Sequence, residues 1–125
     1  MKTKTVVVVG GSTGIGKELV TTFKNLGANV KSISRANCDI TKQEEIDLYF
    51  SNINQVDILI NNAAINYCKS IEEISLNEWN SVIDTNLTSY FYIIKKCLPL
   101  MKYGSKIVNV SSIAGRSKSL VSGVH

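Results

Sequence analysis

The sequence predicts an α/β fold in which a doubly wound parallel sheet is covered by helices on both faces, giving three layers. Short apolar runs typical of buried parallel strands alternate with stretches whose apolar residues recur every three or four positions, as in amphipathic helices. No internal repeat, linker or low-complexity tract interrupts this alternation. Because 125 residues with 44% hydrophobic content suffice for one core, we assign residues 1–125 to a single domain.

The first half of the chain begins with a β-branched run, Val6–Val9, which indicates a strand buried on both faces. The next segment has the apolar spacing of a helix, and Gly27 stands where that helix should end. The residues with this spacing are Ile15, Leu19, Phe23 and Leu26. Val30–Ser34 then resembles a second strand.

The sequence after Ser34 predicts two more helices and two more strands. Thr41 and Glu44 have the spacing of a capping box, and the helix after them places Ile46, Tyr49, Phe50 and Ile53 on one face. A long helix is expected from about Asn77, with Trp79, Ile83, Tyr90 and Ile94 near one stripe, and Pro99 should kink or end it. The remaining strands are expected at Val56–Ile60 and Lys106–Val110.

The composition restricts the location and partners of the protein. The net charge of +4 is explained most simply by a solvated lysine-rich surface, although a basic patch for nucleic acid or a pocket for a phosphorylated ligand has the same charge balance. Cys38, Cys68 and Cys97 form no CxxC pair or ligand cluster, so we expect no disulfide, no metal site and a reducing compartment. Val6–Val9 is too short for a signal peptide or a membrane span. We therefore expect a cytoplasmic protein without a nucleic-acid or membrane partner.

Three polar or glycine-rich segments follow predicted strands. They are Gly10–Gly16, Asn61–Ala64 and Ser111–Gly115. In doubly wound sheets, ligands bind in the crevice outside the carboxyl ends of the strands. The sequence therefore predicts that these three segments line one crevice.

The first of these segments has the features of a phosphate-binding turn. Gly10 allows a sharp turn off the strand, Gly14 allows the backbone to approach a diphosphate, and Gly16 allows the helix to pack closely. The helix N-terminus offers free N–H groups, and Ser12 and Thr13 can add hydroxyl donors. A glycine-rich turn alone is weak evidence, but this spacing is more informative than an isolated GxGxxG, and it is not that of a P-loop.

Four motifs, in order, resemble those of the short-chain dehydrogenase/reductase family. Val9–Gly16 is similar to the family's cofactor fingerprint, with Val9 in place of the usual threonine. Asn61–Ala64 resembles the Asn-Asn-Ala-Gly motif, with Ala64 in place of glycine, and Asn86 matches a helix asparagine. Ile107–Gly115 resembles the strand that delivers the catalytic serine. The resemblance implies a partial NAD(P)-binding, Rossmann-like domain.

The resemblance also implies roles for individual residues. Ser112 would hydrogen-bond the substrate oxygen, and Asn86 would hold a relay water through its backbone. The cofactor would contact Gly10, Ser12, Thr13, Gly14, Ile15 and Gly16 at the diphosphate and nicotinamide side, Asp39 and Ile40 at the adenine, and Asn61 and Ala63 at the adenosine ribose. Simpler explanations stay open, because Asn61 and Asn62 suit an ordinary strand-end turn and Asn86 a packing or capping role.

The choice of cofactor depends on the end of the second strand. An acidic residue there would select NAD, whereas a basic residue pairs with the 2′-phosphate of NADP. Arg35 occupies this place and no acid follows before Asp39, so NADP is favoured, with NAD the alternative. Arg35 could instead stack on the adenine or point to solvent.

The chain departs from the family pattern in two places. Only three residues separate Arg35 from Asp39, where the family usually has a helix and much of a strand, so we expect a trimmed sheet edge. The family's Tyr-x-x-x-Lys motif is also missing, since no tyrosine follows Tyr103 and His125 is better explained as a frayed end than as a base. We therefore expect an exposed apolar edge at Lys106–Val110 and little turnover by this chain.

The leading hypothesis is an NADP-preferring oxidoreductase that moves hydride between the nicotinamide and a small carbonyl/alcohol substrate. The alternative is a non-catalytic dinucleotide-binding module completed by a partner chain. A Rossmann-like methyltransferase is disfavoured, because a methyl-donor site has no use for the asparagine and double-serine motifs. The sequence does not identify the substrate, and it is compatible with a homo-oligomer.

Overall fold

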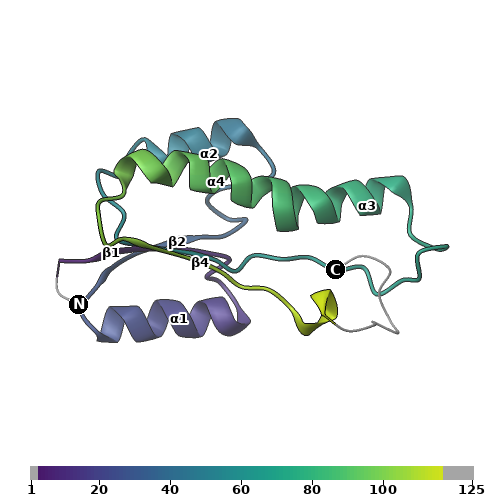
Figure 1. Cartoon of the computed structure of the whole chain (residues 1–125), viewed down its shortest axis with the longest axis horizontal. Helices are drawn as coiled ribbons and strands as arrows, with labels where there is room; N and C mark the ends of the chain where they lie inside the picture. The colour runs from purple at the N-terminus through teal and green to yellow at the C-terminus, as the bar shows by residue number, and fades with distance from the viewer. Residues whose placement is uncertain (1–2, 117–125) are drawn as a thin grey trace.

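The computed structural model describes residues 3–116 and confirms the predicted three-layer fold. Its strands are β1 (Thr5–Val9), β2 (Asn29–Ile33), β3 (Ile58–Asn61) and β4 (Lys106–Asn109). They form one parallel sheet in the order β2-β1-β3-β4. Since all four strands run the same way, their carboxyl ends lie together at one end of the sheet. Helix α3 (Leu76–Ile83) projects toward this end (Figure 1).

Helices cover both faces of the sheet, and the strands divide their side chains between them. Helix α1 (Gly14–Asn25) lies on one face, whereas α2 (Gln43–Phe50) and α4 (Ser89–Cys97) lie on the other (Figure 1). Alternate residues of a strand point to opposite faces. Val6 and Val8 therefore pack with Val20 of α1, and Val7 and Val9 belong to the larger cluster under α2 and α4.

Helix α1 ends as predicted but faces the sheet with different residues. Leu26 follows its last residue, and Gly27 has a φ of +83°. However, Ile15 and Leu26 are 65% and 54% exposed, whereas the buried residues of the helix are Gly16 and Val20. The predicted stripe was therefore wrong at both ends, because the face that contacts the sheet centres on Gly16 and Val20 and leaves Ile15 outside it.

The predicted capping box at Thr41 and Glu44 was wrong. Helix α2 starts at Gln43 after Lys42, without a side-chain cap. The Thr41 hydroxyl instead donates to Asp39 Oδ1 at 2.7 Å, so it is hydrogen-bonded to a nearby carboxylate and does not cap the helix. The predicted inward face is confirmed, since Ile46, Phe50 and Ile53 are buried and Tyr49 packs on the same cluster.

The long helix is divided into three parts. Helix α3 begins after a capping box formed by Ser75 and Glu78, which the sequence analysis missed. A π-helical turn at Asp84–Thr88 separates α3 from α4. Helix α4 ends before a 3₁₀ turn at Leu98–Leu100 that contains Pro99, as predicted. Within residues 3–116, no helix is long and apolar enough to span a membrane.

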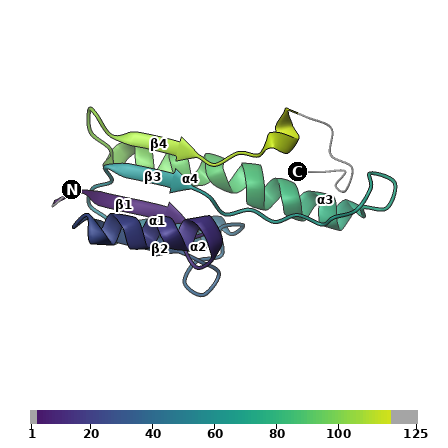
Figure 2. The same cartoon turned by 90° about the horizontal axis from the view of Figure 1, so that it is seen from below.

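Both edges of the described sheet have the predicted character. No strand lies between β2 and α2, so β2 is an edge strand and the trimmed edge is confirmed. At the other edge, β4 pairs only with β3 among the described strands (Figure 2). Its side chains Ile107 and Val108 are 37% and 46% exposed, so an apolar edge faces outward.

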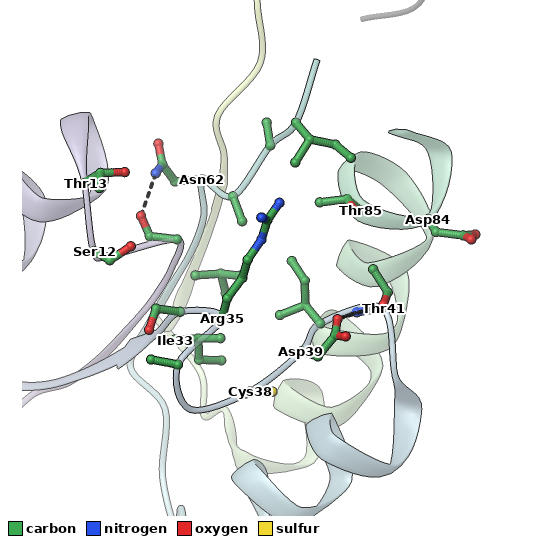
Figure 3. Close-up of a pocket in the computed structure, with 18 of the residues that line it drawn as sticks. Ser12, Thr13, Ile33, Arg35, Cys38, Asp39, Thr41, Asn62, Asp84 and Thr85 are labelled. Carbon is green, nitrogen blue, oxygen red and sulfur yellow. Dashed lines mark hydrogen bonds between the residues drawn. The ribbon is translucent and has the colours of Figure 1, made fainter. Parts of the chain in front are cut away.

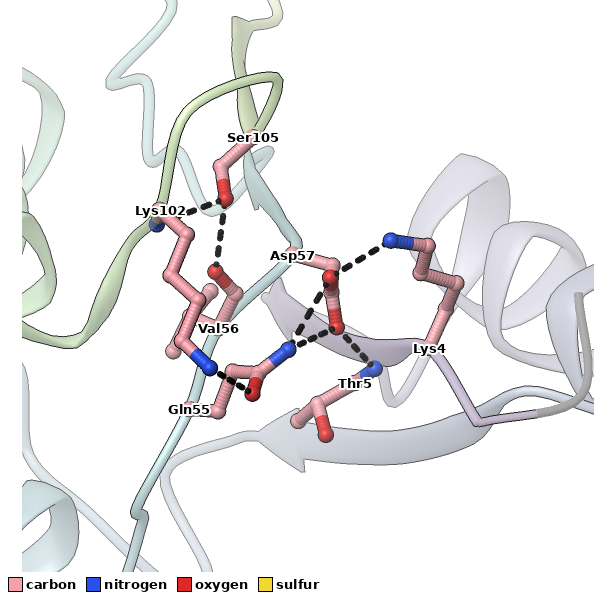
Figure 4. Close-up of polar contacts among 7 residues, drawn as sticks. All are labelled: Lys4, Thr5, Gln55, Val56, Asp57, Lys102 and Ser105. Atoms are coloured by element: carbon pink, nitrogen blue, oxygen red, sulfur yellow. Dashed lines mark hydrogen bonds and ion pairs between the residues drawn. The ribbon is translucent and has the colours of Figure 1, made fainter.

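A polar network fastens the amino ends of the strands (Figure 4). Asp57, just before β3, is 7% exposed and accepts hydrogen bonds from Lys4 Nζ at 2.9 Å and the Thr5 N–H at 2.8 Å. Gln55 donates to both Asp57 carboxylate oxygens at 3.2 Å and accepts from Lys102. These bonds lower the pKa of Asp57, with the Lys4 hydrogen bond as the largest cause. The network ties β1 to β3 at the end of the sheet opposite α3.

Candidate functional site

A cavity of about 770 Å³ lies at the carboxyl ends of the strands (Figure 3). Its walls come from the turn after β1, the segment after β2, the loop after β3 and the start of the π-helical turn. The predicted site residues that line it are Gly10, Ser12, Thr13, Arg35, Asp39, Ile40 and Ala63. The structure thus brings together seven of the predicted site residues from three separate segments.

Two glycines shape the turn after β1. Gly10 has a φ of +81°, and a side chain there would bring its Cβ within 2.7 Å of Ala63 Cα. At Gly16, a Cβ would collide with the Gly10 carbonyl oxygen and approach Asn62 Nδ2 to 2.7 Å. Because both contacts are with backbone or a hydrogen-bonded amide, the turn, helix α1 and the loop after β3 can meet this closely only with glycine at both positions.

Helix α1 begins beside the cavity without a side-chain cap. Thr13 precedes the helix with extended backbone, but its hydroxyl does not accept from the first turn. Ser12 and Thr13 both line the cavity, and Figure 3 shows their side chains near Asn62. The first N–H groups of an α-helix have no partner within the helix, so an uncapped start is suited to an anion. Gly14, Ile15 and Gly16 belong to this first turn but do not line the cavity themselves.

The segment after β2 supplies the charged part of the cavity. Arg35 directs its guanidinium into the cavity (Figure 3). Asp39 Oδ1 accepts from the Thr41 N–H and hydroxyl at 3.0 and 2.7 Å. The Thr41 hydroxyl is the largest cause of the lowered pKa of Asp39, followed by its N–H, and Lys42 and Arg35 act in the same direction. Asp39 is therefore a firmly ionised carboxylate within the field of Arg35.

The loop after β3 joins the turn after β1. Asn62 Nδ2 donates to the Gly10 carbonyl at 3.1 Å, and Asn62 lines the cavity. Asn61, in contrast, is fully buried and does not line the cavity. Its Nδ2 donates to Asn109 Oδ1 of β4 at 2.8 Å, while its Oδ1 has no hydrogen-bond partner among the described residues. The structure thus places Asn61 between two strands and Asn62 at the site.

Asn86 and Tyr90 hold the other side of this loop. The Asn86 carboxamide accepts from the Ile65 N–H and donates to the Ile65 carbonyl, both at 2.9 Å. Tyr90, four residues later, donates its hydroxyl to the Ala63 carbonyl at 2.7 Å. Burial raises the pKa of Tyr90 to about 12, so the phenol keeps its proton. Neither side chain lines the cavity, and both fix its wall from outside.

Ser112 does not line the cavity, and neither does any other residue of Ser111–Gly115. The prediction that three segments line one crevice is therefore confirmed for the first two and wrong for this one. It precedes a 3₁₀ turn at Ile113–Gly115, and its Oγ accepts from the Ala114 N–H at 3.1 Å. Ser111 next to it is exposed. His125 lies outside the described residues. Among residues 3–116, no group of three or more His, Cys, Asp or Glu side chains could hold a metal ion.

The sequence analysis missed several contributors to the site. Thr85 of the π-helical turn lines the cavity, and Tyr90 fixes its wall. The sequence pattern predicts Tyr90 only as part of an apolar stripe, although its spacing of four residues from Asn86 places both on one helix side. That spacing is the one signal that could have indicated a shared role.

Comparison with known proteins decides the family. The family model for short chain dehydrogenase matches residues 24–124, which is most of the chain. The chain belongs to the short-chain dehydrogenase family. This assignment agrees with the parallel sheet and with the cavity at the carboxyl ends of its strands.

Individual relatives of this short-chain dehydrogenase chain cover it almost completely. It is 31% identical to a 3-oxoacyl-[acyl-carrier-protein] reductase of Chlamydia trachomatis, over 90% of this chain and 56% of the relative. The ligand-free aldohexose dehydrogenase of Thermoplasma acidophilum superposes with a TM-score of 0.88 at 31% identity, over 97% of this chain and 54% of that one. A 3-ketoacyl-(acyl-carrier-protein) reductase of Brucella melitensis, solved with NADH, shares the fold with a TM-score of 0.86 at 23% identity, over 96% of this chain and 62% of that one. The chain thus spans little more than half the length of these relatives.

Proposed function

We propose that this chain is the dinucleotide-binding part of an NADP-preferring oxidoreductase that transfers hydride between the nicotinamide and a carbonyl/alcohol substrate. The observation that carries the proposal is the meeting of the glycine turn, the uncapped start of α1 and Arg35 at one cavity. Family membership and the reductases and dehydrogenases among the relatives support the same reaction class.

The residues at the cavity fit a dinucleotide. The close approach at Gly10 and Gly16 brings the start of α1 beside the cavity, where a diphosphate can accept from its N–H groups. Ser12 and Thr13 would add hydroxyl donors to the diphosphate and ribose, with Gly14 at the diphosphate and Ile15 toward the nicotinamide. Asp39 and Ile40 would border the adenine, and Ala63 the adenosine ribose, with Asn61 supporting that wall from between the strands. When bound, the nicotinamide supplies or accepts the hydride.

The remaining residues would act on the substrate side. Ser112 would donate its hydroxyl hydrogen to the substrate oxygen while its Oγ continues to accept from the Ala114 N–H, and Asn86 would hold a water through its backbone carbonyl. The 125 residues contain no tyrosine after Tyr103 to act as the general acid. A general acid contributes about a hundred- to ten-thousandfold to rate, so we propose that this chain alone turns over little.

A non-catalytic module completed by a partner chain is the second candidate. The outward-facing Ile107 and Val108 of β4 favour it, because an open apolar edge is suited to pairing. The codons that follow His125 separate the two candidates. An in-frame Tyr-x-x-x-Lys within a few codons supports the enzyme, whereas a stop codon supports the module.

The proposal also includes a small-molecule carbonyl/alcohol substrate, a cytoplasmic location and a homo-oligomer. The homo-oligomer would form through the long helix, which exposes Leu87 and Phe91.

Isothermal titration of this chain with NADPH and NADH tests the cofactor assignment. A charge-assisted bond from Arg35 is worth about 1.5–3 kcal/mol, so NADPH should bind about ten- to a hundredfold more tightly and Arg35→Ala should remove the difference. Arg116→Ala is the matched control, because Arg116 does not line the cavity. Equal affinities in the unchanged chain would contradict the NADP preference.

An assay of NADPH oxidation with ketones tests the proposed low turnover of this chain. Rapid ketone reduction that Ser112→Ala abolishes would contradict the low turnover.

A further inference from the structure

The turn after β2 is closed by the side chain of Asn37. At the end of β2, the Ile33 carbonyl accepts from the Gly10 and Gly11 N–H groups at 2.8 and 3.1 Å, on the side of β1. Successive carbonyls of a strand point in opposite directions, so the Ser32 carbonyl points to the open edge of the sheet. There it accepts from Asn37 Nδ2 at 2.9 Å and from the Tyr49 hydroxyl at 3.2 Å.

The Asn37 carboxamide uses both of its ends. Its Oδ1 accepts from the Ser34 N–H at 2.9 Å, while its Nδ2 makes the bond to Ser32. The Ser34 carbonyl accepts from the backbone N–H groups of Asn37 and Cys38 at 3.1 and 3.0 Å. One asparagine therefore supplies an acceptor and a donor to the edge of β2, as a neighbouring strand would, and local bonds of this kind stabilise tight turns.

Arg35 lies inside this closed turn. Ser34 on one side is bonded to Asn37 and Cys38, and Cys38 on the other side is 2% exposed within the core cluster. The backbone from which the Arg35 side chain starts is thus fixed at both ends. The guanidinium of Arg35 points into the cavity (Figure 3). A cation presented from a fixed backbone loses less conformational freedom when it binds an anion.

We propose that Asn37 is a positioning residue that sets the specificity for the phosphorylated cofactor by holding Arg35 toward the cavity. This inference rests on the proposed function, because Arg35 must first contact the 2′-phosphate of NADP. Asn37 itself does not line the cavity, so its effect passes through Arg35. Loss of its carboxamide frees the turn, and Arg35 then samples directions away from the phosphate.

The test is a double-mutant cycle on the ratio of NADPH affinity to NADH affinity. Arg35→Ala should lower this ratio by about tenfold or more. Asn37→Ala should lower it by about three- to tenfold while NADH affinity changes by less than about twofold. In the Arg35→Ala background, Asn37→Ala should have no further effect, because residues that act through one another are not additive. Asn52→Ala is the matched control, since Asn52 is an exposed asparagine near the same strand edge whose amide reaches only the Leu48 carbonyl at 3.5 Å.

The outcomes separate this inference from the proposed function. If Arg35→Ala lowers the ratio and Asn37→Ala does not, or if Asn37→Ala weakens both nucleotides equally, the positioning role is overturned and the proposed function stands. If the unchanged chain binds NADPH and NADH equally, the positioning role and the NADP preference are both overturned, whereas dinucleotide binding itself stands. Should Asn37→Ala fail to fold, hydrogen exchange of the unchanged chain decides. Slow exchange of the Ser34 N–H without nucleotide is expected, and fast exchange would contradict the closed turn.

Discussion

The two ends of the parallel sheet use polar residues in opposite ways. At the amino end, Asp57 is surrounded by donors from Lys4, Thr5 and Gln55, so the polar groups satisfy one another. At the carboxyl end, the side chains of Ser12 and Arg35 line a cavity and make no hydrogen bond within residues 3–116. The amino end fastens strands together, whereas the carboxyl end keeps donors available for a ligand.

A side chain at Gly16 should have the largest effect on the carboxyl end. Gly16→Val would force a branched side chain against the Gly10 carbonyl and Asn62. We expect nucleotide binding to be lost and the free energy of unfolding to fall by about 1–3 kcal/mol or more, as in overpacked cores. Nucleotide titration and urea unfolding measure the two effects. Gly115→Ala is the control, because a Cβ there meets nothing within 4 Å, and normal binding by Gly16→Val would show that the close approach is not required.

Asp57→Asn should affect the amino end alone. The substitution keeps the shape but removes the charge that Lys4 and Gln55 bind, so the free energy of unfolding should fall by about 1–3 kcal/mol. Nucleotide affinity should stay within about twofold, because the network lies at the opposite end of the sheet from the cavity. A large loss of affinity in a folded variant would contradict the separation of the two ends.

The same carboxylate predicts a pH dependence. The pKa of Asp57 in the folded chain lies below its ordinary value of 3.8. A lowered pKa contributes stability that is complete above the ordinary value and is lost as the pH falls through the folded value. Acid unfolding of the unchanged chain should therefore include a loss below pH 3.8 that is absent in Asp57→Asn, and identical acid profiles would contradict this.

Tyr90→Phe should have the smallest effect. It removes the hydroxyl that donates to the Ala63 carbonyl and leaves the ring in place. The free energy of unfolding should fall by about 0.5–1.5 kcal/mol, and nucleotide affinity by a few-fold, because the cavity wall loosens. Tyr92→Phe is the matched control from the same helix, since the Tyr92 hydroxyl makes no hydrogen bond within the described part of the chain. If the two variants have equal unfolding free energies and nucleotide affinities, the Tyr90 hydroxyl does not support the cavity wall.

The strands and the glycine turn could be predicted because their signals are local. Val6–Val9 needs only its own sequence to indicate a buried strand, and Gly10 and Gly16 stand at fixed distances from its end. The sequence could not place the cap of α2, because Thr41 had a competing acceptor in Asp39. It also could not distinguish Asn61 from Asn62, since period-two alternation sends one between the strands and the other to the cavity.

The contacts that join distant segments left no such signal. Tyr90 meets Ala63 across 27 positions, and Asn86 meets Ile65 across 21. Both contacts depend on how the divided long helix lies over the loop, which the apolar stripe does not specify. The short interval between Arg35 and Asp39, in contrast, was visible in the sequence and correctly predicted the edge at β2.

The hydrogen bond from Asn62 to the Gly10 carbonyl connects the turn after β1 to the loop after β3. Through Ala63 and Ile65, the same loop is attached to Tyr90 and Asn86. An anion that draws the start of α1 inward would thus tighten a helix on the opposite face of the sheet. Occupancy should be detectable far from the ligand, as slower amide exchange along α4.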